Sequence, residues 1–297
     1  MPSFEIVEPG LFTTVQDRGR HGYQKIGVPV SGAMDEFALR AANLLVGNDQ
    51  GAAGLEMTVL GPTIRFLSPF SIAITGADQS ARLDGEPLPR WRTIYVNTDS
   101  VLTFHQMQDG VRAYLAISGG IDVPVVMGSR STYVKSSIGG LNGRALQKGD
   151  VVSTLSVLSY SSIGPRRLPA ESEVPVYGEH HEIRIIPGPQ KEAFTQAAFN
   201  TLLNAEYKIA LDSDRMGYRL EGPILEHTAG ADIVSDGNPA GSIQVAGDGV
   251  PIVLLADRGT TGGYTKIATA ITADHSTLAQ ALPGHTISFR PVALKEA

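Results

Sequence analysis

The chain has 297 residues, of which 42% are hydrophobic and 18% charged, and it contains no cysteine. The absence of cysteine excludes disulfides, thiolate nucleophiles and cysteine metal sites. The net charge of −6, without clustered basic residues, argues against nucleic-acid binding. The N-terminal stretch MPSFEIVEPG lacks the features of a signal peptide, and no apolar run approaches the ~20 residues that cross a bilayer. We therefore expect a cytoplasmic protein.

Most of the chain is typical of β-structure. Its 33 glycines and 18 prolines, without a collagen-like period, predict many short strands joined by tight turns. Six segments are rich in Val, Ile, Leu or Tyr and are bounded by turn-forming residues. In chain order these predicted strands are Ile72–Thr75, Thr93–Val96, Val101–His105, Ala113–Ser118, Glu182–Ile186 and Val250–Ala256.

Three helices are expected among the strands. The first stops at Gly47, the second spans Gln190–Asn204, and the third begins at the N-cap residue Asp274 and ends before Pro283. The residues expected on the buried faces are Met34, Phe37, Ala38, Ala41 and Leu45 in the first helix and Phe194, Ala197, Ala198 and Leu202 in the second.

A region rich in proline and mixed charge, Ser161–Glu182, is typical of a linker. It predicts a first β-barrel half over residues 1–170, a linker over 171–182 and a second half over 183–297; the N-terminal loop unit could pack against the second half. His180 and His181 lie in this region, and adjacent side chains on an extended segment point in opposite directions. We therefore interpret this pair as solvated linker residues and not as metal ligands.

One internal similarity links the two ends of the chain. Asp17-Arg18-Gly19, Gly22-Tyr23 and Lys25-Ile26 recur as Asp257-Arg258-Gly259, Gly263-Tyr264 and Lys266-Ile267. Each copy precedes a predicted helix. The similarity predicts a duplicated loop–strand–helix unit in two related halves.

Polar residues gather in two glycine-rich stretches of the first half. In the first stretch, arginine side chains could bind a carboxylate or phosphate, or the loop could simply be held by an ion pair between Asp17 and Arg18. In the second, Gly119–Asp150, backbone amides and hydroxyls could form an anion-binding concavity, although an ordinary β-meander would also be rich in small turn residues. The candidate side chains of the two stretches are Gln16, Arg18, Arg20, Ser129, Arg130, Ser131, Thr132, Tyr133 and Arg144.

Two further polar clusters lie in the second half. The first is SDRMGYRLEGP, which contains Asp214 and Arg215; the second is Ser235–Lys266, in which the apolar strand VPIVLLA leads into a loop at Asp257–Gly263. Loops at strand ends commonly carry functional residues. The polar members of the second cluster are Gln244, Asp257, Arg258, Thr260, Thr261, Tyr264 and Lys266.

Several familiar motifs are absent from the sequence. It has no G-x-x-x-x-G-K-[ST] nucleotide loop, no H-E-x-x-H zinc motif and no G-x-S-x-G nucleophile elbow. It also lacks a Met-Lys-Met tripeptide, so we expect no biotin to be attached to this chain, and we predict no metal ligands.

The four clusters together resemble the allophanate hydrolase subunit 2 family, also described as KipA-like or biotin-dependent carboxyltransferase-like. The resemblance runs from TTVQDRGR and GVPVSGAMD through LEMTVLGP, YLAISGGIDVPVVMGSRSTY, GGLNGRAL and SDRMGYRLEGP to GSIQV and TTGGYTKIAT. It covers nearly the whole chain. It implies a mainly β fold of two cyclophilin-like β-barrel modules with a few short helices.

The family includes the C component of bacterial ATP-dependent 5-oxoprolinase, and the resemblance implies that activity. Such a complex opens 5-oxoproline to L-glutamate with a KipI-like B component and a LamB/YcsF-type A component, using ATP and Mg at the level of the complex. ATP is thought to phosphorylate the lactam oxygen before water opens the ring, and cations near that site would lower the barrier.

The resemblance also implies roles for the polar clusters. Asp257 or Asp214 is the candidate base, and loops of both halves are expected to meet in one anion-binding cleft. Lys266 and Tyr264 complete the catalytic candidates. The candidate substrate- or phosphate-binding residues are Gln16, Arg18, Arg20, Ser129, Arg130, Ser131, Thr132, Arg144, Arg215, Gln244, Thr260 and Thr261.

Two other functions fit the same family resemblance. The chain could be a carboxyltransferase module that moves a carboxyl group from carboxybiotin to urea or a similar amide, with the biotin carrier on another chain. It could also be a non-catalytic KipA-like regulator that binds a kinase inhibitor, in which case the polar clusters would be largely structural.

Overall fold

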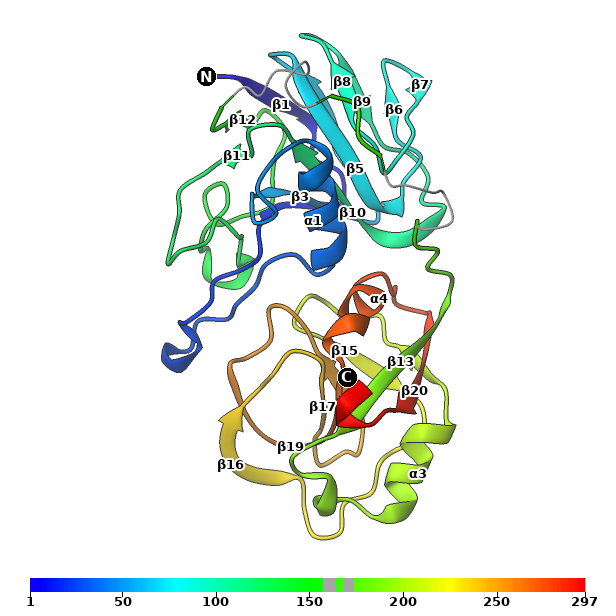
Figure 1. The fold of residues 1–297 in the computed structure, drawn as a ribbon. Helices are drawn as coiled ribbons and strands as arrows, with labels where there is room; N and C mark the ends of the chain where they lie inside the picture. The colour runs from blue at the N-terminus through cyan, green and yellow to red at the C-terminus, as the bar shows by residue number, and fades with distance from the viewer. Residues whose placement is uncertain (157–163, 168–173, 297) are drawn as a thin grey trace. The chain divides into compact units, whose positions relative to one another are not determined.

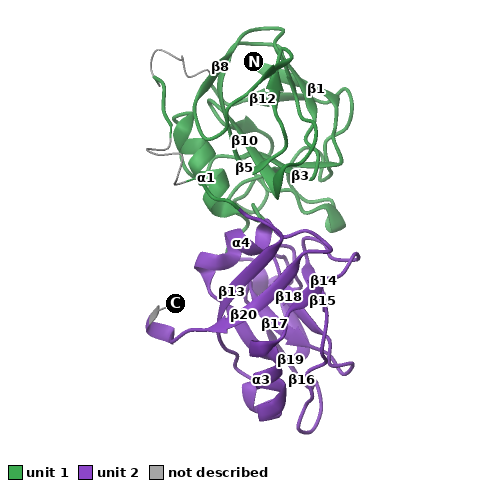
Figure 2. Ribbon diagram, turned by 90° about the vertical axis from the view of Figure 1, so that its right-hand side faces the viewer, with its two compact units in different colours: residues 1–21, 31–176 green, residues 22–30, 177–297 purple. Residues whose placement is uncertain are grey.

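The computed structural model describes residues 1–156, 164–167 and 174–296. The chain divides into two compact units, and each is described by itself. Unit 1 comprises Met1–His21 and Ser31–Val176, and unit 2 comprises Gly22–Val30 and Tyr177–Ala297 (Figure 2, green and purple). Within the described residues, no helix has both the length and the apolar character to span a bilayer.

Unit 1 is built from two β-sheets around one apolar core. The core is formed by Phe, Ile, Leu, Val and Met side chains from both sheets, among them Phe4, Phe66 and Leu115, none of which is exposed. The seven-stranded sheet has the order β11–β12–β1–β4–β9–β6–β7, and the five-stranded sheet has the order β2–β3–β10–β5–β8. The strands are β1 Ser3–Glu8, β2 Phe12–Gln16, β3 Gly54–Thr58, β4 Thr63–Phe66, β5 Phe70–Asp78, β6 Arg82–Leu83, β7 Glu86–Pro87, β8 Ile94–Val96, β9 Val101–Thr103, β10 Asp109–Ile117, β11 Ile121–Asp122 and β12 Val151–Thr154.

Helix α1, Glu36–Leu45, packs against β5 and β10 of unit 1 (Figure 1). Asp35 caps it by accepting a hydrogen bond from the backbone N–H of Ala38 at 2.9 Å. The predicted helix is confirmed, and Met34, Ala38 and Leu45 are buried as expected, but Phe37 and Ala41 are not. Leu39 and Ala42 are buried, whereas Phe37 is 50% exposed, because the two strands lie beneath the Leu39 side of the helix.

Unit 2 contains a closed β-barrel. Its strands pair in the order β13–β20–β14–β15–β18–β17–β19, and a further pairing between β13 and β19 closes the ring, with β16 added beside β19. A closed ring leaves no unpaired edge among its strands. The strands are β13 His180–Pro187, β14 Tyr207–Ile209, β15 Gly217–Glu221, β16 Asp232–Gly237, β17 Ser242–Val245, β18 Pro251–Leu254, β19 Thr261–Ala270 and β20 Thr286–Pro291.

The helices of unit 2 are shorter than expected. The second predicted helix begins at Gln196, where α3 (Gln196–Asn204) is capped by the Thr195 hydroxyl; the preceding turn, Lys191–Ala193, is a separate 3-10 helix. Ala198 is buried as expected, but Ala197 is exposed. The third helix, α4 (His275–Ala279), follows Asp274, whose carboxylate binds Arg184 and does not cap the helix.

The mainly β prediction is confirmed. Each of the six predicted strands overlaps an observed one, namely β5, β8, β9, β10, β13 and β18, although four of the predicted segments extend one to two residues past the observed strand. The expected loop at Asp257–Gly263 is wrong in its second part, because strand β19 begins at Thr261. Its two glycines, Gly262 and Gly263, have the signature of a turn in the sequence. In the structure both lie in a strand, and the side chains of Gln244 and Asn238 leave no room for a Cβ atom at Gly262.

The linker interpretation of the histidine pair is wrong. His180 and His181 are the first residues of β13, which pairs in parallel with β20. Their side chains do point in opposite directions: His180 is exposed, whereas His181 is buried and stacks on His285 with ring centroids 5.4 Å apart. Of the predicted linker, residues 171–173 lie outside the described residues.

The two copies of the internal similarity have different local structures. In the first, residues 24–26 form a 3-10 helix that ends at Gly27 in the left-handed conformation, and no strand lies between Asp17 and α1. In the second, Tyr264 and Lys266 lie on β19. The predicted loop–strand–helix duplication is therefore wrong, because only the second copy finds strand partners, in β16 and β17.

Candidate functional site

The Asp17 carboxylate joins the two polar stretches of unit 1. It follows β2 and accepts hydrogen bonds from the hydroxyls of Ser129 at 2.6 Å and Ser131 at 2.5 Å. It also accepts from the backbone N–H groups of Arg130 and Gly19, at 2.6 and 2.8 Å. The ion pair between Asp17 and Arg18, which was the alternative prediction, is not formed in the structure. The candidate residues 129–131 thus lie next to Asp17, with the two serine hydroxyls and the Arg130 backbone N–H turned toward it.

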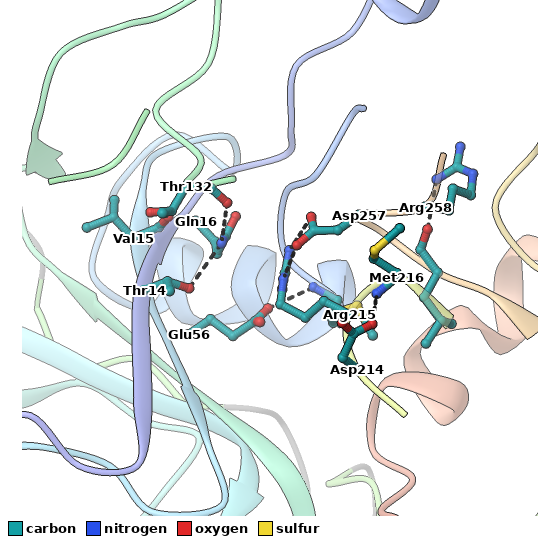
Figure 3. Close-up of polar contacts among 12 residues, drawn as sticks. Thr14, Val15, Gln16, Glu56, Thr132, Asp214, Arg215, Met216, Asp257 and Arg258 are labelled. Atoms are coloured by element: carbon teal, nitrogen blue, oxygen red, sulfur yellow. Dashed lines mark hydrogen bonds and ion pairs between the residues drawn. The ribbon is translucent and has the colours of Figure 1, made fainter. Parts of the chain in front are cut away.

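Gln16 and Thr132 belong to the same part of unit 1. Gln16 is fully buried, and its Nε2 donates to the Thr14 hydroxyl at 3.0 Å and to the Thr132 carbonyl at 3.1 Å (Figure 3). Thr132 in turn donates its hydroxyl to the Val15 carbonyl at 2.9 Å. Within the described residues the Gln16 Oε1 atom has no hydrogen-bond partner, which makes it a buried acceptor that an N–H donor could satisfy.

Three predicted anion-binding arginines of unit 1 have protein acceptors. Arg18 is exposed and pairs with Glu36 at 2.7 Å. Arg20 is fully buried and donates to the carbonyl of Ser131 at 2.7 Å. Arg130 donates to the Val123 carbonyl at 3.1 Å. The carbonyl that accepts from Arg130 is neutral, so this bond does not neutralise the guanidinium charge of Arg130.

The fourth predicted arginine, Arg144, forms a bidentate ion pair with Asp150, with distances of 2.7 and 2.8 Å. The hydrogen bonds from Arg144 hold the pKa of the Asp150 carboxyl below its usual value, and the same pair raises the pKa of Arg144. This arginine therefore has a carboxylate partner and fixes the turn before β12.

A buried carboxylate that the sequence analysis missed lies at the start of α1. Glu56 is fully buried on β3 and accepts hydrogen bonds from the Tyr114 hydroxyl at 2.7 Å and the Met34 backbone N–H at 2.8 Å. The Tyr114 hydroxyl accepts from the backbone N–H of Asp35 at 2.7 Å. The sequence did contain a signal for this site: a glutamate stands between the apolar residues Leu55 and Met57. A carboxylate at such a buried position needs hydrogen-bond partners, so it marks a polar cluster.

In unit 2, Asp257 and Arg215 form a buried ion pair. The Asp257 carboxylate accepts from Arg215 Nε at 2.9 Å and from Nη2 at 3.2 Å (Figure 3). The backbone N–H of Asp257 donates to the Arg215 carbonyl at 2.9 Å, so the two loops lie side by side. The neighbouring Asp214 is exposed and accepts from the Met216 backbone N–H at 2.6 Å.

Lys266 is a buried cation on β19. Only 1% of the residue is exposed, and its Nζ donates to Asp236 on β16. Asp236 also accepts from Gln190 Nε2 at 3.1 Å, and Gln190 Oε1 accepts from the Lys266 backbone N–H at 3.1 Å. The hydrogen bond from Lys266 lowers the pKa of the Asp236 carboxyl. The lysine is therefore held by two side chains that the sequence analysis did not single out.

Gln244 lies on β17 opposite Lys266 in the strand register. A Cβ atom at Gly262 would lie 2.6 Å from Gln244 Nε2 and 2.8 Å from Asn238 Nδ2. Only glycine leaves room for both amides at this point. Gln244 and Lys266 thus lie on paired strands of one barrel, and Asn238 lies directly after β16.

Tyr264 is 43% exposed on the same strand as Lys266, and its carbonyl accepts from Gln244 Nε2 at 3.4 Å. Thr260 and Thr261 line a pocket of about 580 Å³ in unit 2. This part of unit 2 therefore combines a buried cation, two amides and accessible hydroxyls, which together could orient an amide substrate and stabilise negative charge on its oxygen.

The comparisons with known proteins agree on one family. The family model "Carboxyltransferase domain, subdomain A and B" matches residues 26–291. The C component of the 5-oxoprolinase of Escherichia coli (strain K12) is 42% identical over 296 residues, which are 99% of this chain and 92% of that protein.

Two solved structures are also similar over 98% of this chain. The crystal structure of the Kluyveromyces lactis urea carboxylase has a TM-score of 0.90 and 33% identity, and the chain spans 27% of it. The crystal structure of TTHA0988 has a TM-score of 0.87 and 34% identity, and the chain spans 55% of it. The match over most of its length, with the two-unit β-fold, shows that the chain belongs to the family of carboxyltransferase domains with subdomains A and B.

Proposed function

We propose that the chain acts as the C component of an ATP-dependent 5-oxoprolinase, which opens 5-oxoproline to L-glutamate with a KipI-like B component and a LamB/YcsF-type A component. The observation that carries the proposal is the 42% identity to the Escherichia coli C component, over 92% of its length. The identity to the urea carboxylase of Kluyveromyces lactis is lower, at 33%.

The chemistry needs an electrostatic catalyst. A five-membered lactam is a poor electrophile, and phosphoryl transfer from ATP to its oxygen activates the ring carbonyl for attack by water. Both steps develop negative charge on oxygen atoms. Preorganised cations and N–H donors stabilise such charge more strongly at a buried site than in water.

Lys266 is the residue of unit 2 best suited to that role. Its ammonium is held by Asp236 at a buried position, and the side-chain amide of Gln244 lies on the neighbouring strand. The lysine would place positive charge near the lactam oxygen, and the amide would orient the ring. Asp257 is engaged by two hydrogen bonds from Arg215; as a candidate base it would have to exchange that partner.

ATP and Mg belong to the complex in this proposal, and we assign no magnesium ligand to this chain. Among the residues that the structure describes, no group of three His, Asp or Glu side chains is arranged to hold a metal ion.

Reconstitution of the three components tests the proposal. We expect release of glutamate and phosphate from 5-oxoproline and ATP to require this chain. Lys266→Met should lower turnover about 100-fold or more, because it removes a charge that stabilises the transition state. Lys208→Met, at an exposed lysine of β14, is the matched control and should leave turnover unchanged.

Thermal unfolding of both variants would show that they are folded. Turnover that continues without this chain would exclude a catalytic role for it in the complex. Full activity of a folded Lys266→Met variant would exclude the role of this lysine but not that of the chain.

A second candidate function is carboxyl transfer from carboxybiotin to urea or a similar amide. The structural similarity to the Kluyveromyces lactis urea carboxylase, with a TM-score of 0.90, favours it. The two reactions differ in one requirement: carboxyl transfer needs biotin on a carrier and consumes bicarbonate. Streptavidin, which binds biotin almost irreversibly, should stop carboxyl transfer and leave 5-oxoprolinase activity intact.

A further inference from the structure

The charged residues that line the pocket of unit 2 are all positive. Its volume is about 580 Å³, within the range of small-molecule sites. Two of its lining residues, Lys25 and Arg258, carry positive charge, and none carries negative charge. The lining residues are Gln24, Lys25, Gly237, Asn238, Pro239, Ala240, Arg258, Thr260 and Thr261. The net charge of the whole chain is −6, so this local excess of positive charge runs against the composition.

Arg258 is a buried cation whose hydrogen bonds to the described residues all go to neutral carbonyls. It is 7% exposed; its Nε donates to the Asn238 carbonyl at 2.7 Å and its Nη1 to the Leu255 carbonyl at 3.0 Å. The neighbouring carboxylate, Asp257, binds Arg215 instead. Its Nη2 has no hydrogen-bond partner among the described residues. A guanidinium in this situation retains both charge and donors for an incoming anion.

Lys25 brings a second cation to the same pocket. It lies in the 3-10 helix Gln24–Ile26, belongs to unit 2 and is exposed. In the part of the chain that the structure describes, Lys25 has no carboxylate within ion-pair distance. An exposed lysine on a short helix can reach an anion as a flexible point charge, whereas Arg258 is fixed.

Neutral donors complete the lining. The hydroxyls of Thr260 and Thr261 lie at the pocket, and neither forms a hydrogen bond with another described residue. Asn238 is 5% exposed; its Nδ2 donates to the Gly259 carbonyl at 3.2 Å, and its Oδ1 has no partner among the described residues. The threonine hydroxyls can donate to an anion, whereas the Asn238 Oδ1 is an acceptor that a donor such as water would satisfy.

We infer that this pocket binds the oxyanion of a small substrate, with Arg258 as the fixed partner, Lys25 as the mobile one and the two threonine hydroxyls as further donors. The inference rests on the proposed function for its choice of ligands, because 5-oxoproline supplies a carboxylate and ATP supplies phosphates. Both groups share the chemistry that an arginine–lysine pair recognises.

Calorimetric titration of the full chain by itself tests this inference. The probes are inorganic phosphate, 5-oxoproline and 2-pyrrolidinone, which is the same lactam ring without the carboxylate. We expect saturable binding of phosphate or 5-oxoproline and none of 2-pyrrolidinone. Binding of phosphate alone would assign the pocket to a phosphoryl group, and binding of 5-oxoproline alone to the substrate carboxylate.

The variants Lys25→Gln and Lys208→Gln provide the matched comparison, because both lysines are exposed on unit 2 and only Lys25 lines the pocket. Lys25→Gln should weaken anion binding about tenfold, and Lys208→Gln should not. Thr261→Val should also weaken it, because the hydroxyl donor is lost. Binding should fall as ionic strength rises.

Equal binding by the two lysine variants, or no saturable binding of either anion up to roughly 10 mM, would overturn the inference. This outcome is separate from that of the reconstituted complex. An inactive complex with intact anion binding would contradict the proposed function alone, and an active complex with no anion binding by this chain would contradict the pocket assignment alone.

Discussion

At the level of single residues, buried polar groups in unit 1 mainly fix the structure. Asp17 is a hydrogen-bond acceptor for the loop at Ser129–Ser131, and Glu56 is an acceptor for the start of α1. Both carboxylates are nearly or fully buried, so each would be costly without its donors. The serine hydroxyls of this stretch bind a carboxylate of the protein itself. The stretch therefore resembles a site for an anionic ligand in its composition.

Tyr114→Phe should destabilise unit 1. Burial, and then the charge of Glu56, raises the pKa of the Tyr114 hydroxyl well above its usual value, so the hydroxyl stays protonated and donates to Glu56. Removal of the hydroxyl takes one hydrogen-bond donor away from the buried Glu56 carboxylate. We expect the free energy of unfolding to fall by about 1–3 kcal/mol, measured by chemical denaturation.

The control for this variant is Tyr23→Phe. Tyr23 is partly exposed, and its hydroxyl has no hydrogen bond among the described residues. It should change stability by less than about 0.5 kcal/mol. Equal effects of the two substitutions would mean that the Tyr114–Glu56 bond adds little to the fold.

At the level of elements, strand β5 depends on one glycine. Gly76 has a φ of +73°, and its pairing with β10 is irregular between Asp109 and Ala113. A Cβ atom there would lie 2.4 Å from the Arg112 carbonyl oxygen. The sequence analysis predicted only Ile72–Thr75 as a strand and stopped at this glycine, whereas the strand continues through it to Asp78.

Gly76→Ala should therefore lower the free energy of unfolding by more than the strain of a positive φ alone would. Gly85→Ala is the matched control, because Gly85 has a φ of +87° with no atom within 4 Å of an added Cβ. We expect Gly85→Ala to cost about 1 kcal/mol and Gly76→Ala at least about 2 kcal/mol more, measured as differences in unfolding free energy. Similar costs for both would show that β5 can shift to admit the methyl group.

At the level of the whole molecule, ion pairs make stability depend on acid pH. Three aspartates, Asp150, Asp236 and Asp248, have a pKa lowered chiefly by hydrogen bonds from Arg144, Lys266 and Arg219. The unfolded chain therefore binds more protons in acid than the folded chain. The stabilisation is fully present above the unfolded carboxyl pKa of about 4 and is lost as the pH falls through the lower folded values.

Arg144→Met should reveal this dependence, because the side chains of Arg144 and Asp150 are only 30% and 13% exposed. At neutral pH the variant should be less stable by about 1 kcal/mol, and the difference should shrink as the pH falls below about 4. The exposed pair Arg290–Glu182 supplies the control Arg290→Met, which should change stability little at any pH. A difference that stays constant through acid pH would show that Arg144 stabilises by packing and not through Asp150.

The sequence by itself determined the mainly β fold, the six strands rich in β-branched residues, the first helix with its stop at Gly47, and the family. These features follow from local periodicity, turn residues and long ordered motifs. Only the tertiary structure decided that Leu39 and not Phe37 of α1 is buried, that Thr261–Ala270 continues as a strand through two glycines, and that His180 and His181 begin β13.

The same division holds for the candidate sites. The residue types of Lys266, Gln244, Thr260 and Thr261 could be selected from the sequence, but Asp236 and Gln190, which hold the lysine, could not. Likewise, the meeting of Lys25 with Arg258 at one pocket brings together residues more than 200 positions apart in the chain. That loops of both halves form one cleft stays a prediction. Such pairings are set by which strands neighbour one another, and strand order depends on long-range packing that no local pattern encodes.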